Sequence, residues 1–61
     1  MVTIETLIRN EERDLEGFRH SIATLEGKPG TRWLIGGLEQ NAVLAERAIA
    51  ILKAEQKRHR T

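Results

Sequence analysis

The sequence predicts an all-α fold: an antiparallel two-helix hairpin that dimerises into a four-helix bundle. Apolar residues recur at steps of three and four through residues 4–25, which is the spacing of one helix face. A short stretch containing glycine and proline follows at 27–31, and a loop of this length makes its two helices antiparallel neighbours. The segment after the loop is apolar over much more than one face, which indicates association with a further chain.

The chain is expected to form one domain. It comprises a first helix over about 3–26, a turn at 27–31, a second helix over about 32–57 and a basic tail at 58–61. Sixty-one residues lie near the lower limit for a single hydrophobic core. Because there is no cysteine to form a disulfide or a thiolate zinc site, oligomerisation is the remaining common source of stability.

The first helix has a continuous contact face. Thr3 precedes it, and its hydroxyl can accept a hydrogen bond from an N–H of the first turn. The face runs in unbroken steps of four and three when Glu11 is counted as a member. This seam consists of Ile4, Ile8, Glu11, Leu15, Phe18, Ile22 and Leu25. Such a pattern is typical of a helix that packs along its length against one partner helix.

The segment 27–31 is interpreted as a turn. Gly27 suits the left-handed position just after a helix, and Pro29 cannot continue the helical hydrogen bonds. Thr31 is expected to cap the second helix. The residues GKPGT resemble part of a phosphate-binding loop, but that motif follows a β-strand, and no strand is expected here.

The second helix carries two adjacent apolar stripes. Together they cover roughly 200° of its circumference, whereas about 100° is usual for a helix with one partner. The stripe expected to face the first helix consists of Leu34, Ile35, Leu38, Ala42, Ala45, Ile49 and Leu52. The other, called the outer stripe below, consists of Trp33, Gly37, Leu44, Ala48 and Ile51.

The two helices can be paired layer by layer. The predicted layers join Leu25 to Ile35, Ile22 to Leu38, Phe18 to Ala42, Leu15 to Ala45 and Ile8 to Leu52. In two of these layers a large residue of the first helix faces an alanine of the second, and this complementarity allows close packing.

Composition and charge indicate a folded protein. The chain is 31% charged and 39% hydrophobic, with a net charge of +1, which is not the profile of a disordered segment. Residues 1–26 carry three arginines against six acidic residues, and residues 27–61 carry seven basic against three acidic residues. The two halves should therefore attract, although exposed pairs contribute only about 0–1 kcal/mol each. No signal peptide or membrane span is predicted, so a cytoplasmic location is expected.

Glu11 and Asn41 are the polar residues assigned to a register-fixing or buried polar role. Glu11 lies at the centre of the seam, where it would face Ile49. It is either a buried carboxylate with a raised pKa, acting as an acid, base or ligand, or a polar residue that fixes the register or reaches Arg47 or a second chain. We favour the second interpretation, because single polar seam residues are known to fix register.

Glu12, Glu16 and His20 share the spacing of metal ligands on one helix face. Di-iron helical bundles need a Glu-x-x-His pair and further inward glutamates, and the chain has neither. We interpret these residues as a solvated face, and predict no metal, no cofactor and no catalytic residues. Trp33 could anchor an interface or close the loop end of the core, and the sequence leaves both open.

Two copies joined through the outer stripe would bury it, with the second helices central and the first helices peripheral. The predicted function is a small non-enzymatic protein–protein interaction or regulatory module, a homodimeric adaptor or inhibitor acting through the wide apolar face of the second helix. Its expected partners are itself and one other protein, with no membrane contact.

The alternative is a nucleic-acid-binding hairpin dimer. Its phosphate contacts would be Lys53, Lys57, Arg58 and Arg60 of the basic C-terminal region, although cations also favour a helix C-terminus without any ligand. The architecture is similar to that of the small RNA-binding hairpin dimers of plasmid copy control, which implies an RNA partner. That class needs a basic outer face on the first helix, where this chain alternates Glu12 and Glu16 with Arg9 and Arg13.

Overall fold

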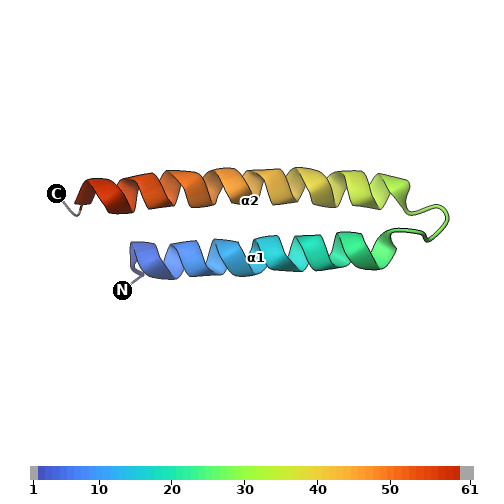
Figure 1. Ribbon diagram of the computed structural model, residues 1–61, viewed down its shortest axis with the longest axis horizontal. Helices are drawn as coiled ribbons and strands as arrows, with labels where there is room; N and C mark the ends of the chain where they lie inside the picture. The colour runs from blue at the N-terminus through green and yellow to red at the C-terminus, as the bar shows by residue number, and fades with distance from the viewer. Residues whose placement is uncertain (1, 60–61) are drawn as a thin grey trace.

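Two helices form nearly all of the computed structural model, which describes residues 2–59 (Figure 1). Helix α1 spans Ile4–Leu25, and helix α2 spans Arg32–His59. They lie side by side in opposite directions and pack against each other. The all-helical hairpin predicted from the sequence is confirmed. Helix α2 continues through residues 58 and 59, which the sequence assigned to the tail.

Helix α1 begins with the predicted cap. Thr3 has an extended backbone, with φ −99° and ψ 163°, and its Oγ1 accepts a hydrogen bond from the backbone N–H of Thr6 at 3.2 Å. Glu5 lies in the first turn, where a negative charge is favourable beside the unpaired N–H groups. The start of the helix is therefore determined by residues close to it in the sequence.

Helix α1 ends at a turn that contains two left-handed glycines. The N–H of Glu26 donates to the carbonyl of Ile22 at 2.9 Å, and Gly27 follows with φ +84°, as predicted for the position after a helix. Gly30 has φ +78° and comes directly after Pro29. Proline fixes φ near −65° at one turn position, and glycine supplies the positive φ at the next.

Thr31 joins the two helices, in a way that differs from the prediction. Its backbone carbonyl accepts from the N–H groups of Leu34 and Ile35 at 3.0 and 3.1 Å, in the first turn of α2. Its hydroxyl points the other way, donating toward the carbonyls of Leu25 at 3.0 Å and Lys28 at 2.8 Å. The single hydroxyl proton is therefore shared between a carbonyl at the end of α1 and one in the turn. The carbonyl of Leu25 also accepts from the N–H of Lys28 at 3.0 Å.

The core is a single narrow layer between the helices. Among residues 2–59, the buried hydrophobic residues are Ile8, Ala42 and Ala45. The rest of the seam is half-buried, as are Ile35, Leu38, Ile49 and Leu52 of α2. Leu34 was expected in this layer but is 40% exposed, because it lies beyond the end of α1 at Leu25. The small, buried residues of α2 in this layer are thus Ala42 and Ala45, near the middle of the helix, and larger apolar residues lie on either side of them.

Three contacts between side chains show the register of the hairpin. They join Glu12 to Lys53, Arg19 to Glu46 and Glu5 to Gln56. The predicted pairing would place Ala48 opposite Glu12 and Asn41 opposite Arg19, so two of these contacts lie further along α2. Helical side chains lean toward the N terminus of their own helix. In an antiparallel pair, two side chains that touch therefore come from residues on the C-terminal side of the backbone positions that directly face each other, on both helices.

The hairpin is a rod with little interior. Its principal extents are 50 × 17 × 14 Å, and its solvent-accessible surface is 5041 Å². Within the described part of the chain, neither helix has the length and apolar character needed to cross a membrane. Most side chains are consequently available at the surface, and the distribution of apolar ones among them defines the candidate site.

Candidate interaction surface

The outer stripe of α2 is exposed. Trp33 is 76% exposed, Ile51 69% and Leu44 55%, while Gly37 is exposed and Ala48 half-buried. Of the two roles considered for Trp33, closing the core within one chain does not match this exposure. Large apolar side chains lose about 1.5–3 kcal/mol of possible burial energy when they are left in water. Burial of the outer stripe against a partner would therefore be energetically favourable.

The three large residues of the stripe lie in one line. Leu44 follows Trp33 by eleven residues, and Ile51 follows Leu44 by seven, which are close to three and two full helical turns. The side chains therefore project from α2 in nearly the same direction. Together they form a straight apolar ridge along the helix.

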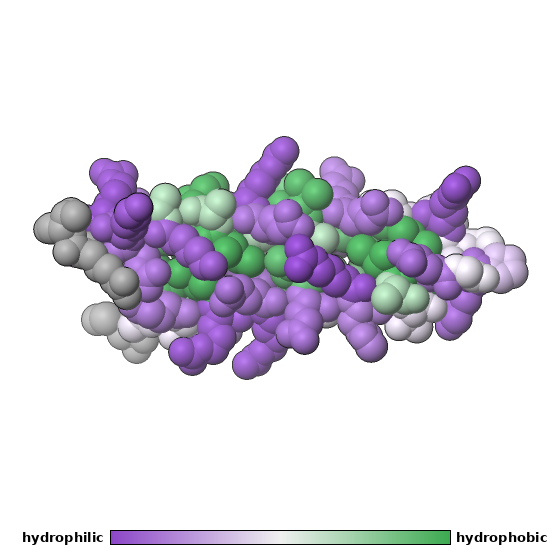
Figure 2. All heavy atoms as spheres, viewed as in Figure 1, coloured by the Kyte–Doolittle hydropathy of each residue, from purple (hydrophilic) through white to green (hydrophobic). Residues whose placement is uncertain are grey.

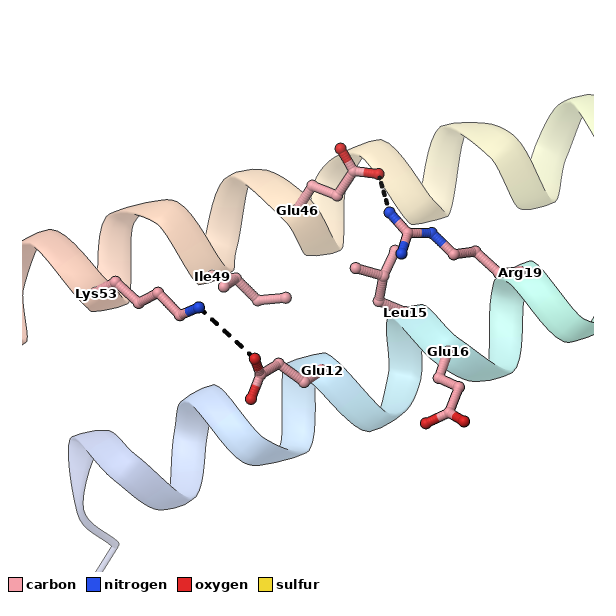
Figure 3. A pocket seen from close by; sticks show the side chains of 7 residues that line it. All are labelled: Glu12, Leu15, Glu16, Arg19, Glu46, Ile49 and Lys53. Carbon is pink, nitrogen blue, oxygen red and sulfur yellow. Dashed lines mark hydrogen bonds and ion pairs between the residues drawn. The ribbon is translucent and has the colours of Figure 1, made fainter.

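The opposite side of α2 carries the ion pairs with α1 (Figure 3). Nη2 of Arg19 lies 3.0 Å from Oε1 of Glu46, and Nζ of Lys53 lies 3.7 Å from Oε2 of Glu12. Leu44 precedes Glu46 by two residues, and Ile51 precedes Lys53 by two. Two residues rotate a helix by about 200°, so the ridge and the ion pairs point in nearly opposite directions.

The ion-paired side contains a shallow hollow of about 460 Å³. Figure 3 shows the side chains of Leu15 and Ile49 between the helices, whereas Glu16 points away from them. The hollow is lined by Glu12, Leu15, Glu16, Arg19, Glu46, Ile49 and Lys53. In the view of Figure 2, most of the apolar surface lies in a band between the helices, with further apolar patches at the upper edge and hydrophilic side chains around and across the band. Charged side chains therefore restrict access to the core here.

A second hollow, of about 270 Å³, lies at the loop end of the outer stripe. It is lined by Trp33, Leu34, Gly37, Leu38 and Asn41. Asn41 is exposed, so within one chain it is not the buried polar residue that the sequence suggested. A Cβ atom added to Gly37 would meet no atom of the described residues within 4 Å. The stripe thus combines a large exposed indole with an empty notch one turn further along α2.

Glu11 is half-buried within the seam. Among the described residues it makes no ion pair with Arg47, which is exposed, and no hydrogen bond to another side chain. A half-buried carboxylate at the edge of the helix pair remains in contact with water. This position fits a polar break in the seam better than an enclosed acid or base.

The residues Glu12, Glu16 and His20 do not converge. Glu12 turns toward Lys53, while Glu16 points away from the helix pair (Figure 3). His20 lines a different hollow, near Leu25 and Leu38. No cluster of three or more candidate metal ligands occurs in the part of the chain that the structure describes.

The basic C-terminal region is partly neutralised. Lys53 pairs with Glu12 across the helices. Within α2, Oε2 of Glu55 lies 3.6 Å from Nη1 of Arg58, and Oε1 of Glu55 lies 3.1 Å from Nε2 of His59. Lys57 is exposed, and the fourth predicted phosphate contact, Arg60, lies outside the described residues. A nucleic-acid phosphate would have to compete with these carboxylates for two of the cations.

Sequence reasoning missed the cross-helix ion pairs and the exposure of Leu7 on α1 and Val43 on α2. Leu7 is adjacent to the buried Ile8 but lies about 100° away on the helix, which a helical projection can show. Val43 lies about as far from Leu44 on α2. Both belong to the edges of the apolar surface and not to the ridge.

No protein-family model matches the chain, and no curated protein or solved structure matches it. The candidate surface is therefore defined by the exposure, shape and charge of its own residues. A straight apolar ridge with a notch at one end is suited to packing against another helix.

Proposed function

We propose that this chain is a small non-enzymatic protein-interaction module that dimerises through the outer stripe into a four-helix bundle. One observation carries the proposal: Trp33, Leu44 and Ile51 form an exposed apolar line on a hairpin whose own core is a thin layer. Burial of a ridge of this kind against another helix supplies the stabilisation that the single hairpin lacks.

The exposed area supports a further binding surface. A compact monomer of 6.9 kDa is expected to expose roughly 4,000 Å², so the observed 5041 Å² is about 1,000 Å² larger. A standard protein interface buries about 800 Å² on each partner. The excess is therefore large enough for one such interface. Dimerisation would also bring the exposed area of each chain nearer to the area expected for a compact protein of its mass.

The module is proposed to act as a homodimeric adaptor or inhibitor. With the ridge buried between the two copies of α2, the outer faces of α1 would remain available to a second protein. A protein of this kind works by occupying part of the surface of its target. The absence of cysteine suits a reducing compartment, so the proposal includes a cytoplasmic location.

The test compares two neighbouring substitutions, Leu44→Glu and Val43→Glu. Both replace an exposed apolar side chain of α2, but only Leu44 belongs to the ridge. The wild type should sediment as a dimer at about 10 µM, where a micromolar Kd already gives mostly dimer. Leu44→Glu should sediment as a monomer with helical circular dichroism retained, whereas Val43→Glu should remain dimeric. A wild type that is monomeric at this concentration contradicts dimerisation.

Nucleic-acid binding is the second candidate, supported by the exposed Lys57 and the basic last turn of α2. It is the weaker proposal, because Lys53 and Arg58 already face carboxylates. The double variant Lys57→Gln/Arg58→Gln tests it. If the chain binds RNA or DNA, retention should fall steeply with salt and fall further in this variant.

A further inference from the structure

We infer that the partner on the outer stripe is a second copy of this chain in antiparallel orientation, with a two-fold axis passing beside Leu44. The inference rests on the proposed function and specifies the geometry of its dimer. In this arrangement the two turns lie at opposite ends of the bundle. The spacing, size and charge of the residues along the stripe favour this orientation.

The stripe is arranged symmetrically about Leu44. Gly37 lies seven residues before Leu44, and Ile51 lies seven residues after it. A two-fold axis beside Leu44 therefore places Ile51 of each copy over Gly37 of the other. It also brings Trp33 of one copy opposite Glu55 of the other, since each lies eleven residues from Leu44. Self-complementarity of this kind is required of an interface between identical chains related by a two-fold axis.

The residues exchanged by this axis are complementary in size. Ile51 is a large side chain exposed over 69% of its surface, and Leu44 beside the axis is exposed over 55%. Among the described residues, the space above Gly37 is empty, because an added Cβ would meet nothing within 4 Å. Glycine weakens a helix interior, and no contact within residues 2–59 requires it at this position. A side chain of one helix that enters a gap on another is the usual packing of such pairs.

A parallel dimer would be less favourable in both side-chain packing and charge. It would place Gly37 against Gly37 and leave a gap, while Ile51 would meet an equally large Ile51. It would also bring together the two basic last turns of α2, each containing Lys57, Arg58 and His59. Antiparallel packing separates these cations and aligns the helix dipoles favourably.

Disulfide trapping distinguishes the two orientations, because the chain has no cysteine of its own. Gly37→Cys and Ile51→Cys chains are each oxidised alone and after refolding as a mixture. In the antiparallel dimer, identical positions lie fourteen residues apart along the helices, about 21 Å, well beyond the roughly 7 Å limit for a disulfide. The mixture should therefore give the mixed disulfide, identified by intact mass, and each variant alone should remain unlinked.

Leu44→Cys controls for the existence of the interface, since it should link to itself in either orientation. If Leu44→Cys links, but Ile51→Cys alone links to itself, the antiparallel geometry is overturned and the proposed dimer stands. If Leu44→Cys does not link and the wild type sediments as a monomer, both proposals are overturned. A dimeric wild type in which Leu44→Cys does not link overturns this interface and its geometry, while self-association stands.

Filling the notch gives a second readout that needs no cross-link. Gly37→Leu should weaken dimerisation at least tenfold in the antiparallel arrangement, because it blocks entry of Ile51. Gly17→Leu is the matched control: a Cβ there also meets nothing within 4 Å, and Gly17 lies on α1, away from the ridge. Unchanged or tighter dimerisation of Gly37→Leu overturns the inference, since a parallel dimer would use the added side chain to fill its gap.

Discussion

Nη2 of Arg19 lies 3.0 Å from Oε1 of Glu46, and this ion pair joins α1 to α2 on the side of α2 opposite to Leu44. The signs are reversed relative to the overall charge of the two halves, since the acidic half supplies the cation. Both side chains remain more than half exposed, at 64% and 52%. The pair therefore contributes to how the helices align more than to how strongly they bind.

Removing this ion pair should have a small effect that depends on salt. Arg19→Gln is expected to lower the free energy of unfolding by no more than about 1 kcal/mol, because the pair is solvent-exposed. The charge-swapped double variant Arg19→Glu/Glu46→Arg should recover most of the loss. Both differences should shrink at about 1 M salt, where the screening length is about 3 Å. A loss of several kcal/mol that persists in high salt would contradict the exposed geometry.

The small residues of α2 that face α1 should not tolerate enlargement. Ala45 is 4% exposed and packs under the larger side chains of α1, so Ala45→Leu is expected to reduce the free energy of unfolding by about 1–3 kcal/mol. Ala50 is an exposed residue of the same helix, and Ala50→Leu should change stability by no more than about 0.5 kcal/mol. Denaturant titration of the two variants tests the comparison, and equal effects would contradict the assigned contact face.

The fold could be predicted because its determinants are local. The seam of α1 and the turn at Gly27 follow from helical periodicity and from the φ angles open to glycine. The register of the side-chain contacts was harder to predict from the sequence, because the contact of Glu12 with Lys53 depends on the direction in which both side chains lean. The role of Thr31 was also missed, because a hydroxyl can donate as well as accept, and the choice depends on where the end of α1 lies.

The candidate surface could be predicted in position but not in exposure. Apolar width alone placed Trp33 on a second stripe, yet the sequence could not decide between a core and an interface role. Asn41 was harder to assign, because its position at the edge of both stripes makes its burial depend on the partner. For Glu11, helical periodicity predicted its place in the seam, whereas its half-buried state follows from the narrowness of a core made by only two helices.

Two threonines with different hydrogen bonds should respond differently to alanine. Thr3→Ala removes an acceptor from the first turn of α1 and should cost about 0.5–2 kcal/mol of stability. Thr24 instead donates to the carbonyl of His20 at 2.9 Å, inside the helix. That carbonyl also takes part in helical bonding, and alanine is the better helix former, so Thr24→Ala should leave stability equal or higher. Thermal unfolding followed by circular dichroism measures both, and Thr3→Ser should restore the cap.

The glycines of the turn and of the helix should give changes of opposite sign. Gly27 has φ +84° and Gly30 has φ +78°, a region in which an L side chain costs roughly 1–2 kcal/mol, so alanine at either position should destabilise the hairpin by about that amount. Gly17 lies inside α1, where an added Cβ meets nothing within 4 Å, and Gly17→Ala should stabilise it by up to about 1 kcal/mol.

Asparagine separates backbone strain at Gly27 from any effect of side-chain volume. It is larger than alanine but enters the left-handed region more readily, so Gly27→Asn should be more stable than Gly27→Ala. If φ is the controlling quantity, denaturant titrations should show the highest stability with glycine at position 27, a lower one with asparagine and the lowest with alanine. If asparagine is the least stable of the three, steric volume controls the turn, which would contradict the open space around Gly27.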